Sequence, residues 1–125
     1  MSRDVYEYAV IRVMPKVERG ELINAGVLLY CQPRGYLCAR VALDPARLRA
    51  LDPHADVEGV RRALSAYELA CGEEAGALAA ESLGGRFRWL TAPRSTIVQA
   101  GPVHAGLTAD PDTELARLFD KLVRV

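Results

Sequence analysis

The chain has 125 residues, of which 50% are hydrophobic, and its 16 Lys and Arg balance 16 Asp and Glu. This length predicts a single domain, residues 1–125, with a core that needs no disulfide or metal to fold. The balanced charge disfavours general nucleic-acid binding, and the absence of a signal peptide or of an apolar run long enough to cross a membrane predicts a cytoplasmic protein.

The first part of the chain predicts three strands. The stretch from Val5 to Met14 is rich in Val, Ile and Tyr, which is typical of an interior strand, and Pro15 ends it. The segment Lys16 to Ile23 is polar and contains a glycine, so we expect a loop. Asn24 to Cys31 and Tyr36 to Leu43 then pair as a hairpin around a turn that contains proline and glycine.

The side chains of this hairpin divide into two faces. If Cys31 faces Tyr36, alternate residues of both strands fall on the same side of the sheet. One face then carries Leu28, Tyr30, Leu37, Ala39, Val41 and Leu43. The other carries Val27, Leu29, Cys31, Tyr36, Cys38 and Arg40. We expect the first face to point into the core.

Three helices are predicted from their start signals. Asp44-Pro45 and Asp110-Pro111 each supply an N-cap followed by a proline for the first turn. Asp56 caps the helix between them, which Gly72 ends, and the segment Glu73 to Gly85 is expected to be a connector, either without regular structure or with one helical turn. The apolar stripes are Val60, Leu64, Tyr67 and Cys71 in the middle helix and Leu115, Leu118, Phe119 and Leu122 in the last.

Two further strands are expected between the connector and the last helix. Arg86 to Trp89 alternates charged and aromatic residues, which is the period-two pattern of a strand with one apolar face. Pro93 interrupts the backbone and predicts an exposed turn, followed by a short strand from Ile97 to Ala100. A Gly-Pro-x-His-x-Gly turn then surrounds His104.

Together these elements predict an α+β fold. We expect a two-layer sandwich in which a mainly antiparallel sheet of four to five strands carries about three helices on one face. The open face would then expose an apolar patch formed by Val27, Leu29, Tyr36, Phe87 and Trp89. Such a patch either marks an interface or is covered by a loop or by the Ala-rich connector.

No motif for cofactor or metal chemistry is present. The three cysteines, Cys31, Cys38 and Cys71, lack C-x-x-C spacing, and we expect them to be reduced packing residues. His54 beside Pro53 is interpreted as a solvated loop residue. The chain has neither a phosphate-binding glycine loop nor a nucleophile elbow, so we expect no cofactor and no metal, and nucleotide hydrolysis is disfavoured.

Three stretches carry a resemblance to a known family. YEYAVIRVMP, ERGELINAGVLLYC and RFRWLTAPRSTIVQAGPVHAGLTADP, in this order, resemble the bacterial family catalogued as domain of unknown function 3037. The resemblance runs from about Val5 to the C-terminal helix. Members are often encoded beside a kinase-like protein of the HipA type, so the resemblance implies such a protein as a candidate partner.

A set of polar residues in two predicted loops forms the candidate ligand site. The set is Arg19, Glu21, Asn24, Arg94, Ser95, Thr96, Gln99 and His104. An arginine beside hydroxyl groups can hold a phosphate or a carboxylate, and His104 could donate a proton near neutral pH. The alternative is structural: Arg94 pairs with Glu21, Ser95 and Thr96 cap backbone groups, and His104 bonds a turn carbonyl.

Two functions follow from these expectations. The first is a non-catalytic interaction or regulatory protein that docks on a partner through the open sheet face or the Arg94 turn. The second is a small enzyme or ligand-binding domain that acts on a phosphorylated or carboxylated metabolite at a cluster of Arg19, Glu21, Arg94 and His104. We predict that the loop Lys16 to Ile23 folds toward the Pro93 turn, as the composite ligand site requires. The oligomeric state stays open.

Overall fold

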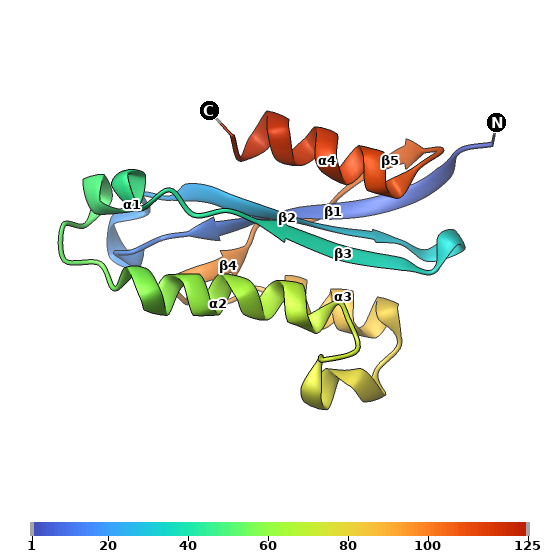
Figure 1. The fold of residues 1–125 in the computed structure, drawn as a ribbon, viewed down its shortest axis with the longest axis horizontal. Coiled ribbons are helices and arrows are strands. Elements are labelled where there is room, and N and C mark those ends of the chain that lie inside the picture. Colours follow the sequence, from blue (N-terminus) through green and yellow to red (C-terminus); the bar gives the residue numbers. More distant parts are fainter. Residues whose placement is uncertain (1, 125) are drawn as a thin grey trace.

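In the computed structural model, which describes residues 2–124, the chain forms an open antiparallel sheet with helices on both faces (Figure 1). The strands are β1 (Asp4–Val13), β2 (Ile23–Cys31), β3 (Tyr36–Val41), β4 (Val98–Ala100) and β5 (His104–Thr108). They lie in the order β3-β2-β1-β4, and β5 also pairs with β1. The predicted α+β class and antiparallel sheet are confirmed.

The edge of the sheet beyond β1 is divided between two short strands. β4 pairs with the end of β1 at Ile11–Val13, and β5 pairs with its beginning at Asp4–Tyr8. Residues 101–103 separate them, and Pro102 among these has no N–H to donate to a ladder. His104 therefore begins a strand, and the predicted turn around it was wrong. The small residues of the segment HAGLT only weakly favour a strand. The strand forms because it pairs with β1, which lies about a hundred residues earlier in the chain, and such a distant contact cannot be read from the local sequence.

The hairpin has the predicted register. Cys31 pairs with Tyr36 and Leu29 pairs with Cys38, so alternate side chains fall on the two expected faces. The turn is a 3-10 helix, η2 (Gln32–Arg34), which ends at Gly35 with φ 57°, a left-handed conformation that favours glycine. Leu28 lies in the core on one side of the sheet, and Val27 lies in the core on the other.

Within residues 2–124, four α-helices accompany the sheet. They are α1 (Pro45–Leu51), α2 (Val57–Ala70), α3 (Leu83–Thr91) and α4 (Pro111–Leu122). Two more 3-10 helices are η1 (Val17–Arg19) and η3 (Gly76–Ala80), the latter within the predicted connector. Asp44, Asp56 and Asp110 accept backbone N–H groups as the predicted N-caps. Every helix within residues 2–124 is too short or too polar to span a bilayer.

The segment predicted as a strand from Arg86 to Trp89 is part of helix α3, so that prediction was wrong. The Ser82 side chain accepts from the Gly85 N–H at 3.0 Å and begins the helix one turn upstream. Residues two apart lie on nearly opposite sides of a helix. Phe87 is accordingly 0% exposed in the core, whereas Trp89 is 55% exposed.

The second face of the sheet is covered by α4, which corrects the expected two-layer arrangement. Figure 1 shows α4 on one side of the sheet and α2 and α3 on the other. The apolar stripe of α4, with Leu115, Leu118 and Phe119, packs on Val27 and Leu29, both 0% exposed. The expected open apolar face therefore does not exist, and no partner can dock there without displacing α4.

Candidate binding groove

The residues expected to form one polar cluster lie apart. Arg19 and Glu21 pair with each other, with Nε and Oε1 2.5 Å apart, and this pair lowers the pKa of Glu21. The Asn24 side chain donates to the Leu122 carbonyl at 3.0 Å, at the end of α4. The His104 ring lies 5.3 Å from the Tyr8 ring, between centroids, on β5. The four-residue cluster Arg19, Glu21, Arg94 and His104 is therefore not assembled.

Arg94 is held by the end of α3 instead of by Glu21. Its Nη2 donates to the Trp89 carbonyl at 2.6 Å, and its guanidinium carbon lies 4.2 Å from the centre of the Trp89 ring. The predicted Arg94–Glu21 pair was wrong. Arg94 keeps its position through a carbonyl and a π face, and no acidic group among residues 2–124 forms an ion pair with it.

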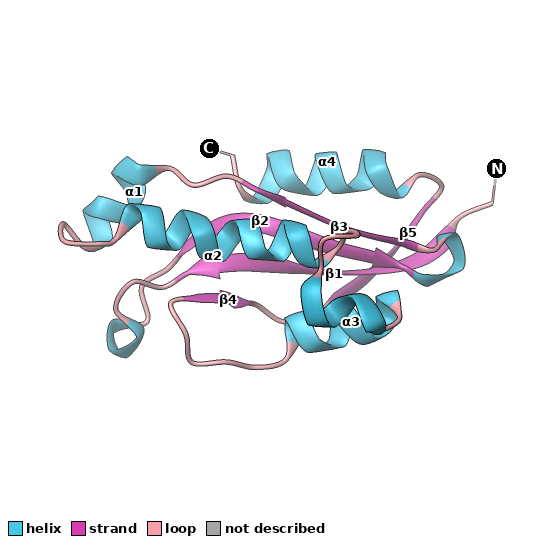
Figure 2. Cartoon of the chain, turned by 60° about the horizontal axis from the view of Figure 1, so that its bottom comes forward, coloured by secondary structure: helices cyan, strands magenta, loops and turns pink. Residues whose placement is uncertain are grey.

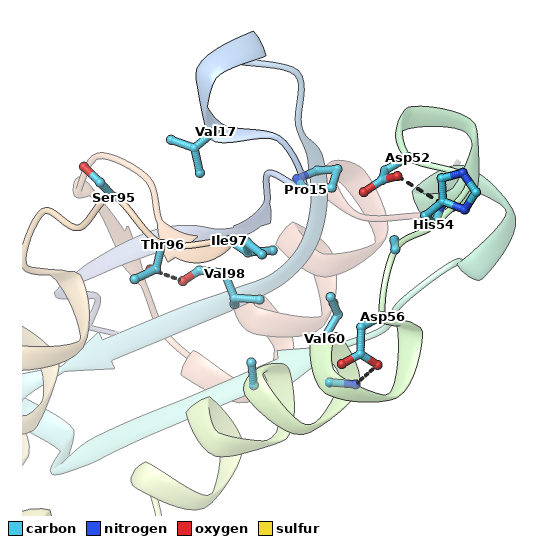
Figure 3. Close-up of a pocket in the computed structure, with 13 residues that line it drawn as sticks. Pro15, Val17, Asp52, His54, Asp56, Val60, Ser95, Thr96, Ile97 and Val98 are labelled. Atoms are coloured by element: carbon cyan, nitrogen blue, oxygen red, sulfur yellow. Dashed lines mark hydrogen bonds between the residues drawn. The ribbon is translucent and has the colours of Figure 1, made fainter.

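The other polar side chains of the Pro93 turn bind the turn itself. The Thr96 hydroxyl donates to the Val98 carbonyl at 2.8 Å, and Gln99 Nε2 donates to the Thr96 carbonyl at 2.7 Å. This agrees with the structural alternative for Thr96. Ser95 is exposed and lies at the rim of a hollow (Figure 3).

The loop after β1 does fold toward this turn, as predicted. The Met14 N–H donates to the Ile97 carbonyl at 2.7 Å, and Val17 lines the same hollow as Ser95 and Thr96 (Figure 3). Arg19 and Glu21 do not line it. The loop contributes apolar surface there rather than charge.

This hollow, which we call the His54 hollow, has a volume of about 590 Å³. Figure 3 shows Asp52 and His54, from the α1–α2 connection, on one side and Ser95 and Thr96 on the other. Its remaining lining is mostly apolar: Pro15, Val17, Ala55, Val60, Ala63, Ile97 and Val98. His54 is exposed, in line with the interpretation as a solvated loop residue, but nothing in the sequence placed it beside the Pro93 turn.

A larger hollow of about 950 Å³, the Trp89 hollow, lies between α2, η3 and α3. Leu69 and Trp89 line it and are 50% and 55% exposed. Tyr67 also lines it, and the Tyr67 hydroxyl is buried without a hydrogen-bond partner among residues 2–124. Burial raises the pKa of Tyr67, so the hydroxyl keeps its proton and remains a donor.

The two hollows adjoin, because Ala63 and Val98 line both. We call the pair the α2 groove. Figure 2 shows α2 running beside β4 with α3 near one end. The charged side chains that line the groove, apart from His54, are Asp52, Asp56, Glu74, Glu81 and Arg94, so carboxylates outnumber the arginine. The lining of the α2 groove is thus mostly apolar, and its charged residues are mostly acidic.

A comparison with models of protein families shows the family of the chain. The model described as protein of unknown function (DUF3037) matches residues 8–123. The chain belongs to the DUF3037 family. No curated protein and no solved structure gives a significant match. The family match spans both walls of the α2 groove, from Pro15 to Val98.

The candidate catalytic side chains of this DUF3037 protein do not meet in the α2 groove. Ser95 lines the His54 hollow and His104 does not, so the two do not form a nucleophile and base there. Within residues 2–124, no three His, Cys, Asp or Glu side chains are grouped so that they could hold a metal ion. The three cysteines are free, and burial raises the pKa of Cys71 to about 12, which suppresses its reactive thiolate.

Proposed function

We propose that this DUF3037 protein is a non-catalytic interaction protein that binds a segment of a partner protein in the α2 groove. The observation that carries the proposal is a set of exposed apolar side chains in the two adjoining hollows of this groove. Leu69, Trp89 and Ile97 are all about half exposed, and each lines the groove. Contiguous exposed apolar surface framed by polar residues is typical of a protein-binding site.

The charges around the groove indicate the chemistry of the partner segment. Asp52 and Asp56 lie at one end, and Glu74 and Glu81 lie in the other hollow. A segment with apolar side chains in its middle and Lys or Arg toward its ends would match both the groove and its rim. Trp89 is suited to anchor such a segment, since exposed tryptophans are enriched among residues that dominate binding energy.

A kinase-like protein of the HipA type is the partner to test first, on the basis of family association. We also propose that the protein acts in the bacterial cytoplasm. Three free cysteines support a reducing compartment, because secreted domains of this size commonly use their cysteines in disulfides. The competing proposal, a small enzyme at the Arg19, Glu21, Arg94 and His104 cluster, loses its support because those side chains do not meet.

Affinity purification from the native host tests the docking proposal. We expect tagged wild-type protein to retain a partner that Leu69→Asp and Ile97→Asp variants lose by at least about tenfold, because a charge in an apolar interface is desolvated without compensation. Leu107→Asp is the matched control: Leu107 is 55% exposed and lies on β5, outside the groove. Equal recovery of the partner by the groove variants and the wild type would contradict the proposal.

A further inference from the structure

A third hollow lies at the break between β4 and β5, and its charged lining residues within 2–124 are two arginines. Its volume is about 440 Å³. Its polar side chains are those of Arg12, Thr91, Arg94 and Gln99, and Pro93 and residues 100–103 supply the rest of its lining. We call it the Arg12 hollow. Arg12 and Arg94 both line it, and none of the Asp and Glu residues within 2–124 does, although the chain as a whole carries no net charge.

Arg12 reaches this hollow from β1. The register of β1 with β2 shifts between Ile11 and Arg12, and Arg12 lies opposite Gln99 of β4. Its guanidinium rests directly on the backbone at Gly101, where a Cβ atom would collide with it. The half-buried Arg12 side chain therefore occupies the space that a side chain at position 101 would take in this arrangement.

Neither arginine of the hollow is neutralised. Arg12 forms no ion pair with a carboxylate among residues 2–124, whereas Arg34, Arg88 and Arg117 each meet a carboxylate at 2.7–2.8 Å. Arg94 donates through Nη2 to the Trp89 carbonyl, and its remaining guanidinium donors have no hydrogen-bond partner within residues 2–124. Two partly buried like charges beside one hollow favour a bound anion, because an anion offsets both their repulsion and their lost hydration.

We propose that the Arg12 hollow binds an oxyanion, a phosphate or carboxylate group, between Arg12 and Arg94. Guanidinium groups present planar pairs of N–H donors that match such oxygens, and Arg94 is already fixed by its stacking on Trp89. The hollow is larger than an inorganic phosphate ion, so the anion is one group of a larger ligand. Arg94 lines both this hollow and the α2 groove, whereas Arg12 lines this hollow and not the groove, so the Arg12 variant tests this site apart from the docking proposal.

Titration with sodium phosphate and with sodium acetate, each against sodium chloride at equal ionic strength, tests the site by calorimetry and by thermal melts. We expect phosphate or acetate to bind the wild type and to raise its melting temperature. Arg12→Gln and Arg94→Lys should each weaken binding by about tenfold or more, because a charge or a two-pronged contact is lost. Arg62→Gln is the control, since Arg62 is exposed on α2 and lines neither this hollow nor the α2 groove.

A second variant keeps the test decisive if the loss of Arg12 impairs folding. Gly101→Ala retains both arginines but places a Cβ against the Arg12 guanidinium, so it should weaken anion binding in protein that circular dichroism shows to be folded. Leu69→Asp should leave anion binding unchanged.

A phosphoserine peptide and glycerol phosphate then distinguish a modified partner from a small metabolite by which of them binds more tightly. Absence of any anion effect beyond that of chloride, or equal anion affinity in Arg12→Gln, would overturn the proposal.

Discussion

Phe87→Ala should lower the free energy of unfolding by about 3–5 kcal/mol, whereas Trp89→Ala should lower it by less than about 1 kcal/mol. Phe87 is 0% exposed and stacks on Tyr30, with ring centroids 5.3 Å apart. Its removal leaves a cavity in the core between the sheet and α2. Trp89 points outward, so its loss removes little beyond its stacking with Arg94.

Urea unfolding followed by circular dichroism measures both changes, since Trp89→Ala removes the only tryptophan and with it the tryptophan fluorescence. The comparison separates helix from strand in this segment. A strand would place Phe87 and Trp89 on the same face and bury them together. Comparable losses for the two variants would therefore contradict the helix α3.

The second large effect is expected at Phe119 in α4. Phe119 is buried against the sheet face that carries Val27 and Leu29, and the Arg40 guanidinium lies 4.9 Å from its ring centre. Phe119→Ala should lower the free energy of unfolding by about 3–5 kcal/mol, because α4 is the helical layer on this face. Lys121→Ala, an exposed change on the same helix, should alter it by less than about 0.5 kcal/mol.

Chemical denaturation of the two α4 variants distinguishes a packed layer from a loosely attached helix. If α4 were peripheral, Phe119→Ala would cost no more than Lys121→Ala. That result would leave Val27 and Leu29 exposed and restore the open apolar face that the sequence predicts. A large difference between the two variants supports helical layers on both sides of the sheet.

The parts of the fold that depend on local rules are predictable from the sequence. The register of the β2–β3 hairpin and the N-caps Asp44, Asp56 and Asp110 follow from alternation and from capping chemistry. Helix α3 escaped prediction because Gly84 and Gly85 are poor helix formers in its first turn. The structure needs small residues there, since a Cβ at Gly84 would lie 2.8 Å from the Tyr30 hydroxyl oxygen.

For the candidate sites too, the sequence predicts residues that lie close together in the chain and misses those that the fold brings together. Arg94, Gln99, Ser95 and Thr96 were identified because they cluster within one turn, and the structure places them in the walls of adjoining hollows. Arg12 was missed, since one arginine within an apolar strand carries no local sign of a site. Arg12 contacts Gly101, which lies 89 positions along the chain from position 12 and is brought beside it by sheet pairing.

Hydrogen exchange of the protein, alone and with its captured partner, tests the docking proposal most directly. The segment 92–97 joins α3 to β4 and lies outside regular helix and strand, so its amides should exchange quickly in the free protein. Binding in the α2 groove should slow exchange in this segment and leave the exposed turn at Gln32–Arg34 unchanged. Slowed exchange at Gln32–Arg34 or in β5, with none in 92–97, would place the partner elsewhere and contradict docking in the groove.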